Sequence, residues 1–223
     1  MVRDPEEWRR AMAVTVAWSV KGGSGTTVVA CALAVAAARD GDALLVDLAG
    51  DAPAVLGIAG PPGPGAWAWL GGGEASLGQC AARAADRLRL VPAGSAARAA
   101  MPDARWEALI SAASELAPHV VIDAGSGNPP EALVELADEA LLVVRPCYLA
   151  LRRASVAQRR PTGVVLVAEP GRALARRDVE GVVGARVRWE VPVDPAIARC
   201  VDAGLLATRI PRALADALTS RAA

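Results

Sequence analysis

Short runs of apolar residues alternate with longer apolar segments along the chain, and this alternation predicts strands followed by helices. Residues 13–20 and 43–48 are β-branched apolar runs typical of buried strands, and the small apolar residues of 26–39 favour a buried helix between them. Strand, glycine-rich loop, helix and strand together form a βαβ unit, which requires parallel strands. The pattern continues, with strands expected at 88–91, 119–123, 140–144, 163–167 and 187–191 and helices near 53–58, 66–70, 102–116, 131–137, 148–159, 178–183, 195–203 and 211–221.

This order of elements predicts an α/β fold, a doubly wound and mainly parallel β-sheet flanked by helices. Residues 49–79 are rich in Gly and Pro, but no shift in composition follows them, so we expect a single domain over residues 1–223. Asp4-Pro5-Glu6-Glu7 has the pattern of a helix start, which predicts a short N-terminal helix at about 4–12.

Composition narrows the class of protein. The 24 basic and 24 acidic side chains balance, which gives no overall electrostatic attraction to nucleic acid or to an anionic membrane. No apolar run reaches the roughly 18 residues of a membrane span, and the acidic N-terminal residues are unlike a signal peptide, so a cytoplasmic protein is expected. After Ile210 the C-terminal helix offers only Leu214 and Leu218 as strong apolar anchors, and so few anchors favour packing on the domain over stable membrane insertion. The four cysteines form no CxxC pair, which favours buried free thiols.

The glycine-rich loop after the first strand carries the candidate chemistry. Gly22, Gly23 and Gly25 allow a tight turn that exposes backbone N–H groups to an anion, and the following helix adds the positive end of its dipole. Thr27 stands where a hydroxyl could ligate Mg²⁺. Lys21 is the only lysine among the 24 basic side chains, and the planar guanidinium of arginine cannot replace a compact ammonium at a tight phosphate site. The loop therefore predicts a phosphate-binding site.

The segment Lys21-Gly22-Gly23-Ser24-Gly25-Thr26-Thr27 resembles the KGGxGK[ST] signature, the deviant Walker A motif of the MinD/ParA/nitrogenase-iron-protein group of P-loop NTPases. Three further segments resemble motifs of this group in the same order along nearly the whole chain. Leu44-Leu45-Val46-Asp47 resembles the strand that ends in the D-x-D switch I motif. Val120-Val121-Ile122-Asp123-Ala124-Gly125 resembles the Walker B strand with switch II. Pro192-Val193-Asp194-Pro195 resembles the late P-x-D segment near the base pocket. The resemblance implies the P-loop NTPase fold.

The resemblance also implies a role for each matching residue. It implies that ATP or ADP binds with Mg²⁺, and that Lys21 reaches across an ATP-sandwich homodimer to the nucleotide of the partner. Catalysis would involve Lys21, Asp47 and Asp51. Nucleotide contacts would come from Lys21, Gly22, Gly23, Ser24, Gly25, Thr26, Thr27, Pro192 and Asp194, and Mg²⁺ contacts from Thr27, Asp47 and Asp123.

Three departures from the family pattern bear on catalysis. Thr26 occupies the position of the second lysine, which grips the β- and γ-phosphates within one subunit, so a main source of charge neutralisation is missing. Ala49 occupies the second D-x-D position, with Asp51 close enough in sequence to substitute, and Ala168-Glu169-Pro170 stands where relatives often have an adenine-contacting asparagine. We therefore expect at most a slow ATPase, acting as a dimerisation switch in chromosome partitioning, septum placement or related positioning with an unidentified protein partner.

A pseudo-ATPase scaffold that uses the fold and the dimer surface without nucleotide is the main alternative, and Thr26 and Ala49 also favour it. A small-molecule kinase or an ATP-dependent ligase would need the missing Walker lysine. An iron–sulfur reductase would need a second cysteine ligand besides Cys147. His119, the only histidine, has no nucleophile motif nearby, which favours a structural role.

Two arginine pairs are the remaining candidates for a binding surface. Arg152-Arg153 and Arg159-Arg160 recur seven residues apart, so they would share one face of a helix over 148–159. A solvated face is the expectation, and docking of DNA phosphates or of an acidic partner stays an alternative.

Overall fold

The structure, a computed structural model, describes residues 13–59 and 63–219 of the 223-residue chain. The helix expected at about 4–12 lies outside these residues. Within them, eight strands form one sheet in the order β3-β4-β2-β5-β1-β6-β7-β8. The strands are β1 (Ala13–Ser19), β2 (Ala43–Asp47), β3 (Ala82–Ala85), β4 (Leu88–Val91), β5 (His119–Ser126), β6 (Glu139–Val144), β7 (Gly163–Ala168) and β8 (Val187–Pro192). The helices are α2 (Thr26–Asp40), α3 (Ala52–Leu56), α4 (Gly65–Leu70), α5 (Leu77–Cys80), α6 (Asp103–Leu116), α7 (Glu131–Leu136), α8 (Tyr148–Ser155), α9 (Arg176–Val183), α10 (Pro195–Asp202) and α11 (Arg212–Thr219).

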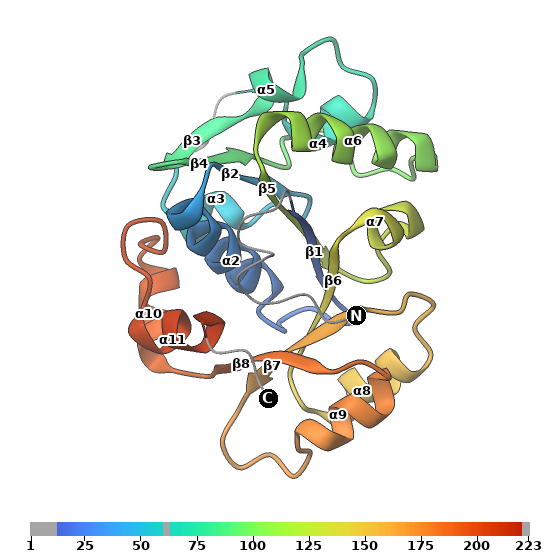
Figure 1. Ribbon diagram of the computed structural model, residues 1–223, viewed down its shortest axis with the longest axis vertical. Helices are drawn as coiled ribbons and strands as arrows, with labels where there is room; N and C mark the ends of the chain where they lie inside the picture. Colours follow the sequence, from blue (N-terminus) through green and yellow to red (C-terminus); the bar gives the residue numbers. More distant parts are fainter. Residues whose placement is uncertain (1–12, 60–62, 220–223) are drawn as a thin grey trace.

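Side chains that alternate along the strands build a separate core on each face of the sheet. On β1, Val16 and Trp18 pack with helices α4 to α9, and Ala17 packs with α2, α3, α10 and α11. Figure 1 shows these two sets of helices on opposite sides of the sheet. All five residues of β2 are buried, as expected for a parallel strand covered on both faces. The predicted doubly wound α/β fold is confirmed.

The sequence pattern does not predict the edge elements α5 and β3. Strand β3 has the sequence ARAA, without the alternation that marks a half-buried strand, and it pairs antiparallel with β4. Its place at the edge of the sheet explains the weak signal, because only one side of the strand is paired. The other strand pairs of the sheet are parallel.

Helix α8 ends at Ser155, four residues before its expected end, so the two arginine pairs do not share a helical face. Pro161 disfavours helical backbone at the residue before it. Arg159 instead forms an ion pair with Glu131 of α7, with 3.2 Å between Nη1 and Oε2. The prediction of one helical face is therefore wrong for Arg152, Arg153, Arg159 and Arg160.

Helix α11 packs on the sheet, in agreement with the expectation for the C-terminal segment. Leu214 and Leu218 are buried in the same core as Trp189 of β8 and Leu33 of α2. Among residues 13–59 and 63–219, none of the helices has the length and apolarity that crossing a bilayer requires. The four cysteines are free thiols, and three of them are buried.

Candidate functional site

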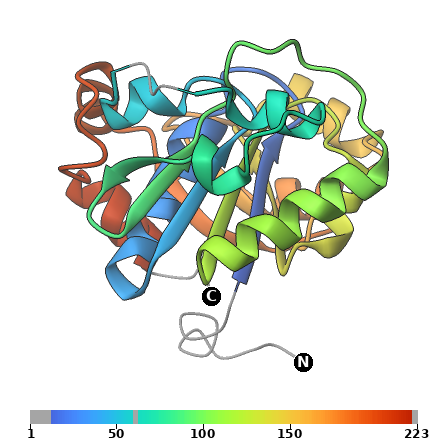
Figure 2. The ribbon, with the colours of Figure 1, turned by 90° about the horizontal axis from the view of Figure 1, so that it is seen from above.

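Loops that follow the central parallel strands meet at one edge of the sheet, the upper edge in Figure 2. Strand β1 lies between β5 and β6, so the loop of residues 20–25 after β1 has a neighbouring strand end on each side. In open α/β sheets, ligands bind at this carboxyl edge, where the strand order diverges in two directions. Asp47 and Asp123 lie opposite each other in the register of β2 and β5, on one side of the loop.

The glycine loop has a tight conformation that its sequence permits. Gly23 and Gly25 have φ angles of 75° and 89°, in the left-handed region that glycine adopts without steric penalty. The hydroxyl groups of Ser19 and Ser24 both donate to the Lys21 carbonyl, at 2.9 and 3.0 Å. Helix α2 begins directly after the loop, at Thr26, so its unpaired N-terminal N–H groups face the loop. The arrangement can bind an anion at the loop.

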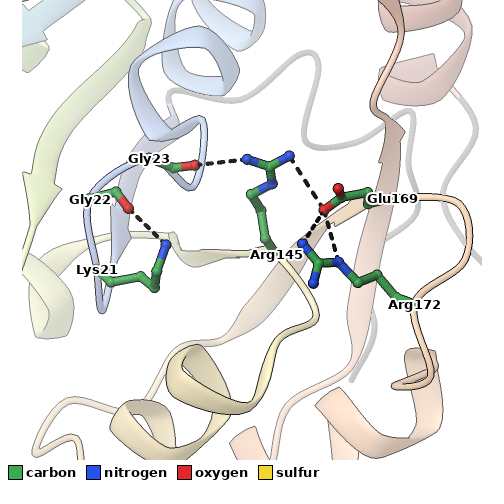
Figure 3. Close-up of polar contacts among 6 residues, drawn as sticks. All are labelled: Lys21, Gly22, Gly23, Arg145, Glu169 and Arg172. Carbon is green, nitrogen blue, oxygen red and sulfur yellow. Dashed lines mark hydrogen bonds and ion pairs between the residues drawn. The ribbon is translucent and has the colours of Figure 1, made fainter.

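The sole lysine of the chain belongs to this loop. Lys21 Nζ donates to the Gly22 carbonyl at 2.9 Å, and this contact is exposed (Figure 3). Thr26, at the position of the second lysine of the signature, is buried in the first turn of α2. Within the described chain, the ammonium group is therefore directed at the loop surface rather than into the fold.

Asp47 holds the loop that follows β2. Its side chain is fully buried, Oδ1 accepts the N–H groups of Ala49 and Gly50 at 2.8 and 2.6 Å, and Oδ2 accepts the Ala52 N–H at 3.1 Å. Burial raises the pKa of Asp47, and the three hydrogen bonds oppose that rise. The carboxylate thus holds the start of helix α3 through contacts within the chain.

Asp123 keeps one carboxylate oxygen free. Its Oδ1 accepts the Gly125 N–H at 3.0 Å, whereas Oδ2 is buried and has no hydrogen-bond partner among the described residues. Burial raises the pKa of Asp123 to about 6, against the opposing effects of the Thr27 hydroxyl and the Gly125 N–H, and nearby Asp47 raises it further.

A buried carboxylate oxygen without a partner, close to a threonine hydroxyl, fits the oxygen ligands that Mg²⁺ prefers. The described residues contain no cluster of three His, Cys, Asp or Glu side chains that would hold a metal by themselves. A site for Mg²⁺ differs from such a cluster, because this ion takes most of its ligands from phosphate and water. Thr27 and Asp123 are therefore the residues that would hold Mg²⁺.

The loops after β2 and within β5 touch each other. Gly125 has a φ of 70°, and a Cβ at this position would lie 3.2 Å from the Ala49 Cβ. The Leu48 N–H donates to the Asp123 carbonyl at 2.9 Å. Asp51 is exposed at the start of α3, where its charge acts on both Asp47 and Asp123. A change at one of these loops therefore acts directly on the other.

A cavity of about 310 Å³ lies on the opposite side of the glycine loop, toward β7 and β8. Its lining combines loop residues with the late P-x-D segment, namely Gly23, Gly25, Val28, Val167, Pro192 and Asp194. The structure thus brings together residues that lie about 170 positions apart in the sequence. The Asp194 carboxylate accepts the Ala196 N–H at 2.6 Å and so caps helix α10. Contact of Pro192 and Asp194 with a nucleotide stays a prediction.

The structure shows a charged cluster beside the loop that the sequence did not predict as part of the site. Arg145, which follows β6, donates to the Gly23 carbonyl at 3.5 Å and to Glu169 at 3.4 Å. Arg172 binds the same Glu169 oxygen at 2.7 and 2.9 Å (Figure 3). These hydrogen bonds lower the pKa of Glu169. The available signal was the position of Arg145, the first residue after a strand that neighbours β1.

His119 lies at the amino end of β5, away from these groups. It is buried beside Gly41, and burial lowers its pKa. This placement agrees with the structural role expected from the sequence.

Solved structures with a similar fold match the chain over almost its whole length. The septum site-determining protein MinD of Pyrococcus horikoshii, complexed with Mg-ADP, has a TM-score of 0.75 at 20% sequence identity, and the match covers 92% of each chain. A ParA family ATPase of Chlorobium tepidum TLS has a TM-score of 0.73 at 20% identity, over 93% of this chain and 96% of that protein. A chain of the MinC:MinD cell division protein complex of Aquifex aeolicus has a TM-score of 0.71 at 20% identity, over 86% of each chain. The amino-acid sequence matches no family model and no curated protein. The chain has the P-loop fold of the MinD and ParA ATPases.

Proposed function

We propose that this chain is a MinD/ParA-like switch that binds ATP or ADP with Mg²⁺, dimerises in response, and hydrolyses ATP slowly or not at all. One observation carries the proposal. The fold sets the glycine loop, with the only lysine of the chain, directly beside the unpaired buried oxygen of Asp123. The Mg-ADP complex of P. horikoshii MinD and the ATP complex of Cyanothece McdA(D38A), both of similar fold, support a nucleotide as the ligand.

Each part of the site has a distinct task in this proposal. Backbone N–H groups of the loop and of the first turn of α2 bind the phosphates. Thr27 and Asp123 hold Mg²⁺, which supplies positive charge to the phosphate oxygens when bound. Asp47 keeps the following loop in place through its three hydrogen bonds, and Asp51 stands at the surface of that loop.

The low rate of hydrolysis follows from two positions. Thr26 offers no charge where a second lysine would neutralise the transferred phosphoryl group. Ala49 offers no carboxylate for an attacking water. A switch of this kind releases its dimer by exchange of nucleotide more than by turnover.

The dimer and its partner complete the proposal. Lys21 makes an exposed contact on the loop, and we propose that its ammonium group reaches the nucleotide of a second copy in the dimer. The MinC:MinD complex is a precedent within this fold for binding a further protein. We propose that the nucleotide-bound homodimer recruits an unidentified protein partner in partitioning, septum placement or related positioning.

The first test concerns Lys21. In Mg-ATP, the wild-type protein is expected to sediment as a dimer, and Lys21→Ala is expected to stay monomeric while still binding nucleotide. Analytical ultracentrifugation with and without Mg-ATP measures both states. Since the chain has one lysine, an amine-reactive reagent modifies Lys21 without interference from other lysines, and Mg-ATP should protect it.

Thermal unfolding provides the control, because Lys21 makes only an exposed contact with its neighbour and its loss should leave stability unchanged. Equal dimerisation of both proteins would refute the role of Lys21 across the dimer.

A scaffold that needs no nucleotide is a second candidate, and one observation favours it. All three donors to the Asp47 carboxylate are backbone N–H groups of the chain, so the fold itself supplies the contacts that hold the loop after β2. Calorimetry separates the two candidates, because saturable binding of Mg-ATP excludes a scaffold that functions without it.

A further inference from the structure

The guanidinium group of Arg145 is held loosely at the edge of the glycine loop. Its contacts with the Gly23 carbonyl and with Glu169 measure 3.5 and 3.4 Å, beyond the 2.7–3.2 Å of a well-formed N–H···O bond. Its Nε is buried and has no hydrogen-bond partner among the described residues. A buried donor without a partner is unfavourable, so an acceptor that entered here would be bound with a gain in free energy.

The charge of Arg145 is not neutralised by its neighbours. Among the described residues, Glu169 is the one carboxylate that forms an ion pair with it, and Arg172 binds the same oxygen through two shorter hydrogen bonds of 2.7 and 2.9 Å. Two arginines therefore share one carboxylate, and the group carries a net charge of about +1. Figure 3 shows Glu169 between the two guanidinium groups, with Arg145 on the side of the loop.

Charged groups flank the loop on both sides, and the wall of the cavity that Arg145 lines also contains Asp194 and Asp202. Asp47 and Asp123 stand on the β2 and β5 side, whereas Arg145 follows β6 and lines the cavity that runs from the loop toward Pro192. A phosphate chain that started at the loop and continued into this cavity would pass Arg145.

We infer that Arg145 binds the phosphate chain of the nucleotide and supplies the positive charge within the subunit that Thr26 lacks, with Glu169 and Arg172 as positioning residues. This inference rests on the nucleotide binding proposed above. On phosphate binding, the long contacts with Gly23 and Glu169 are exchanged for charge-assisted hydrogen bonds to phosphate oxygens. Arginine suits this position because its wide, planar donor group reaches the loop from a neighbouring strand.

The two other cations that touch the loop are placed differently. Lys21 Nζ already donates to the Gly22 carbonyl at 2.9 Å. Arg153 reaches the loop from α8 and contacts the Val20 carbonyl at 3.5 Å, at the end of the loop away from Gly23. Arg153 is therefore a matched control, an arginine at the same contact distance but outside the cavity.

The test measures the affinity of the full chain for ADP and for inorganic pyrophosphate by calorimetry. Arg145→Gln is expected to weaken both about ten- to a hundredfold, the loss expected for one hydrogen bond to a charged group. Arg153→Gln is expected to leave both within about twofold. Thermal unfolding checks that each variant is folded.

The outcomes distinguish the inference from the function on which it rests. If the wild-type chain binds neither ligand, both proposals fall. If it binds ADP and Arg145→Gln binds ADP equally well, only the role of Arg145 is refuted. Loss of ADP affinity with unchanged pyrophosphate affinity would also refute it, because Arg145 would then contact the nucleoside.

Two further variants test the positioning residues by the sign of their effects. Glu169→Gln removes the competing carboxylate and is expected to tighten ADP binding about two- to fivefold. Arg172→Gln removes the arginine that competes for Glu169, so Glu169 then pairs with Arg145 alone. This variant is expected to weaken ADP binding by a similar factor, because Arg145 is less available to the phosphates. A merely structural cluster would weaken binding in both variants, which would overturn the positioning roles.

Discussion

Replacing Asp47 by alanine is expected to lower the free energy of unfolding by about 3 kcal/mol, even without nucleotide. The carboxylate accepts three backbone N–H groups, from Ala49, Gly50 and Ala52, and it is fully buried. The buried Ala52 N–H would lose its acceptor at a cost of about 1–3 kcal/mol. The Ala49 and Gly50 N–H groups are only partly buried and would lose less, and release of a buried charge returns part of the sum. Urea unfolding of the ligand-free variant, compared with the wild type, measures the difference.

Asp51→Ala is the matched control for this prediction. Asp51 lies four residues further along the same loop but is exposed, so its removal should change stability by less than about 0.5 kcal/mol. If Asp47→Ala were as stable as the wild type, the carboxylate would not hold the loop. Asp47 would then be placed only to meet a ligand, which is the role that the family resemblance implies for it.

The contrast between the two aspartates shows where sequence reasoning stops. The alternation of apolar residues was sufficient for β1, β2 and β5, because strands buried on both faces have a strong local signal. The position of Asp47 at a strand end was also evident. Its three hydrogen bonds were not, because they depend on the path of the loop after β2.

Arg145 illustrates a second limit. Nothing in its own neighbourhood marks it among 23 arginines, since its partners come from two other strand ends. Strand order is needed to find it, because β6 becomes a neighbour of the glycine loop only once the sheet is assembled. The error over Arg159 has the same origin. Spacing alone placed it on helix α8, whereas the structure pairs it with Glu131.

Asp123→Asn is expected to raise stability while removing Mg²⁺-dependent nucleotide binding. Burial raises the pKa of Asp123 to about 6, so the folded chain holds a proton that the unfolded chain releases at lower pH. The ionised carboxylate therefore destabilises the fold increasingly as pH rises from about 4 to about 6, and the penalty stays constant at higher pH. A pKa that is about two units higher in the folded than in the unfolded chain corresponds to about 3 kcal/mol of lost stability. The neutral asparagine should recover this free energy at about pH 8, where Asp123 is ionised, and not at about pH 4, where Asp123 is protonated.

Urea unfolding of both proteins across this pH range measures the gain, and the same samples test the ligand. The asparagine oxygen still accepts the Gly125 N–H, so the loop keeps its hydrogen bond. Nucleotide affinity of the wild type should fall below about pH 6, as Asp123 takes up its proton, and the variant should show neither the Mg²⁺ dependence nor this fall.

A variant less stable than the wild type at about pH 8 would mean that the buried charge has a compensating partner in the fold. A gain in stability without loss of Mg²⁺-dependent binding would remove Asp123 from the metal site. Both effects together would show that the fold keeps an unfavourable buried charge for the sake of its ligand. Such a charge is what separates a binding switch from a scaffold, because a scaffold without a nucleotide has no use for it.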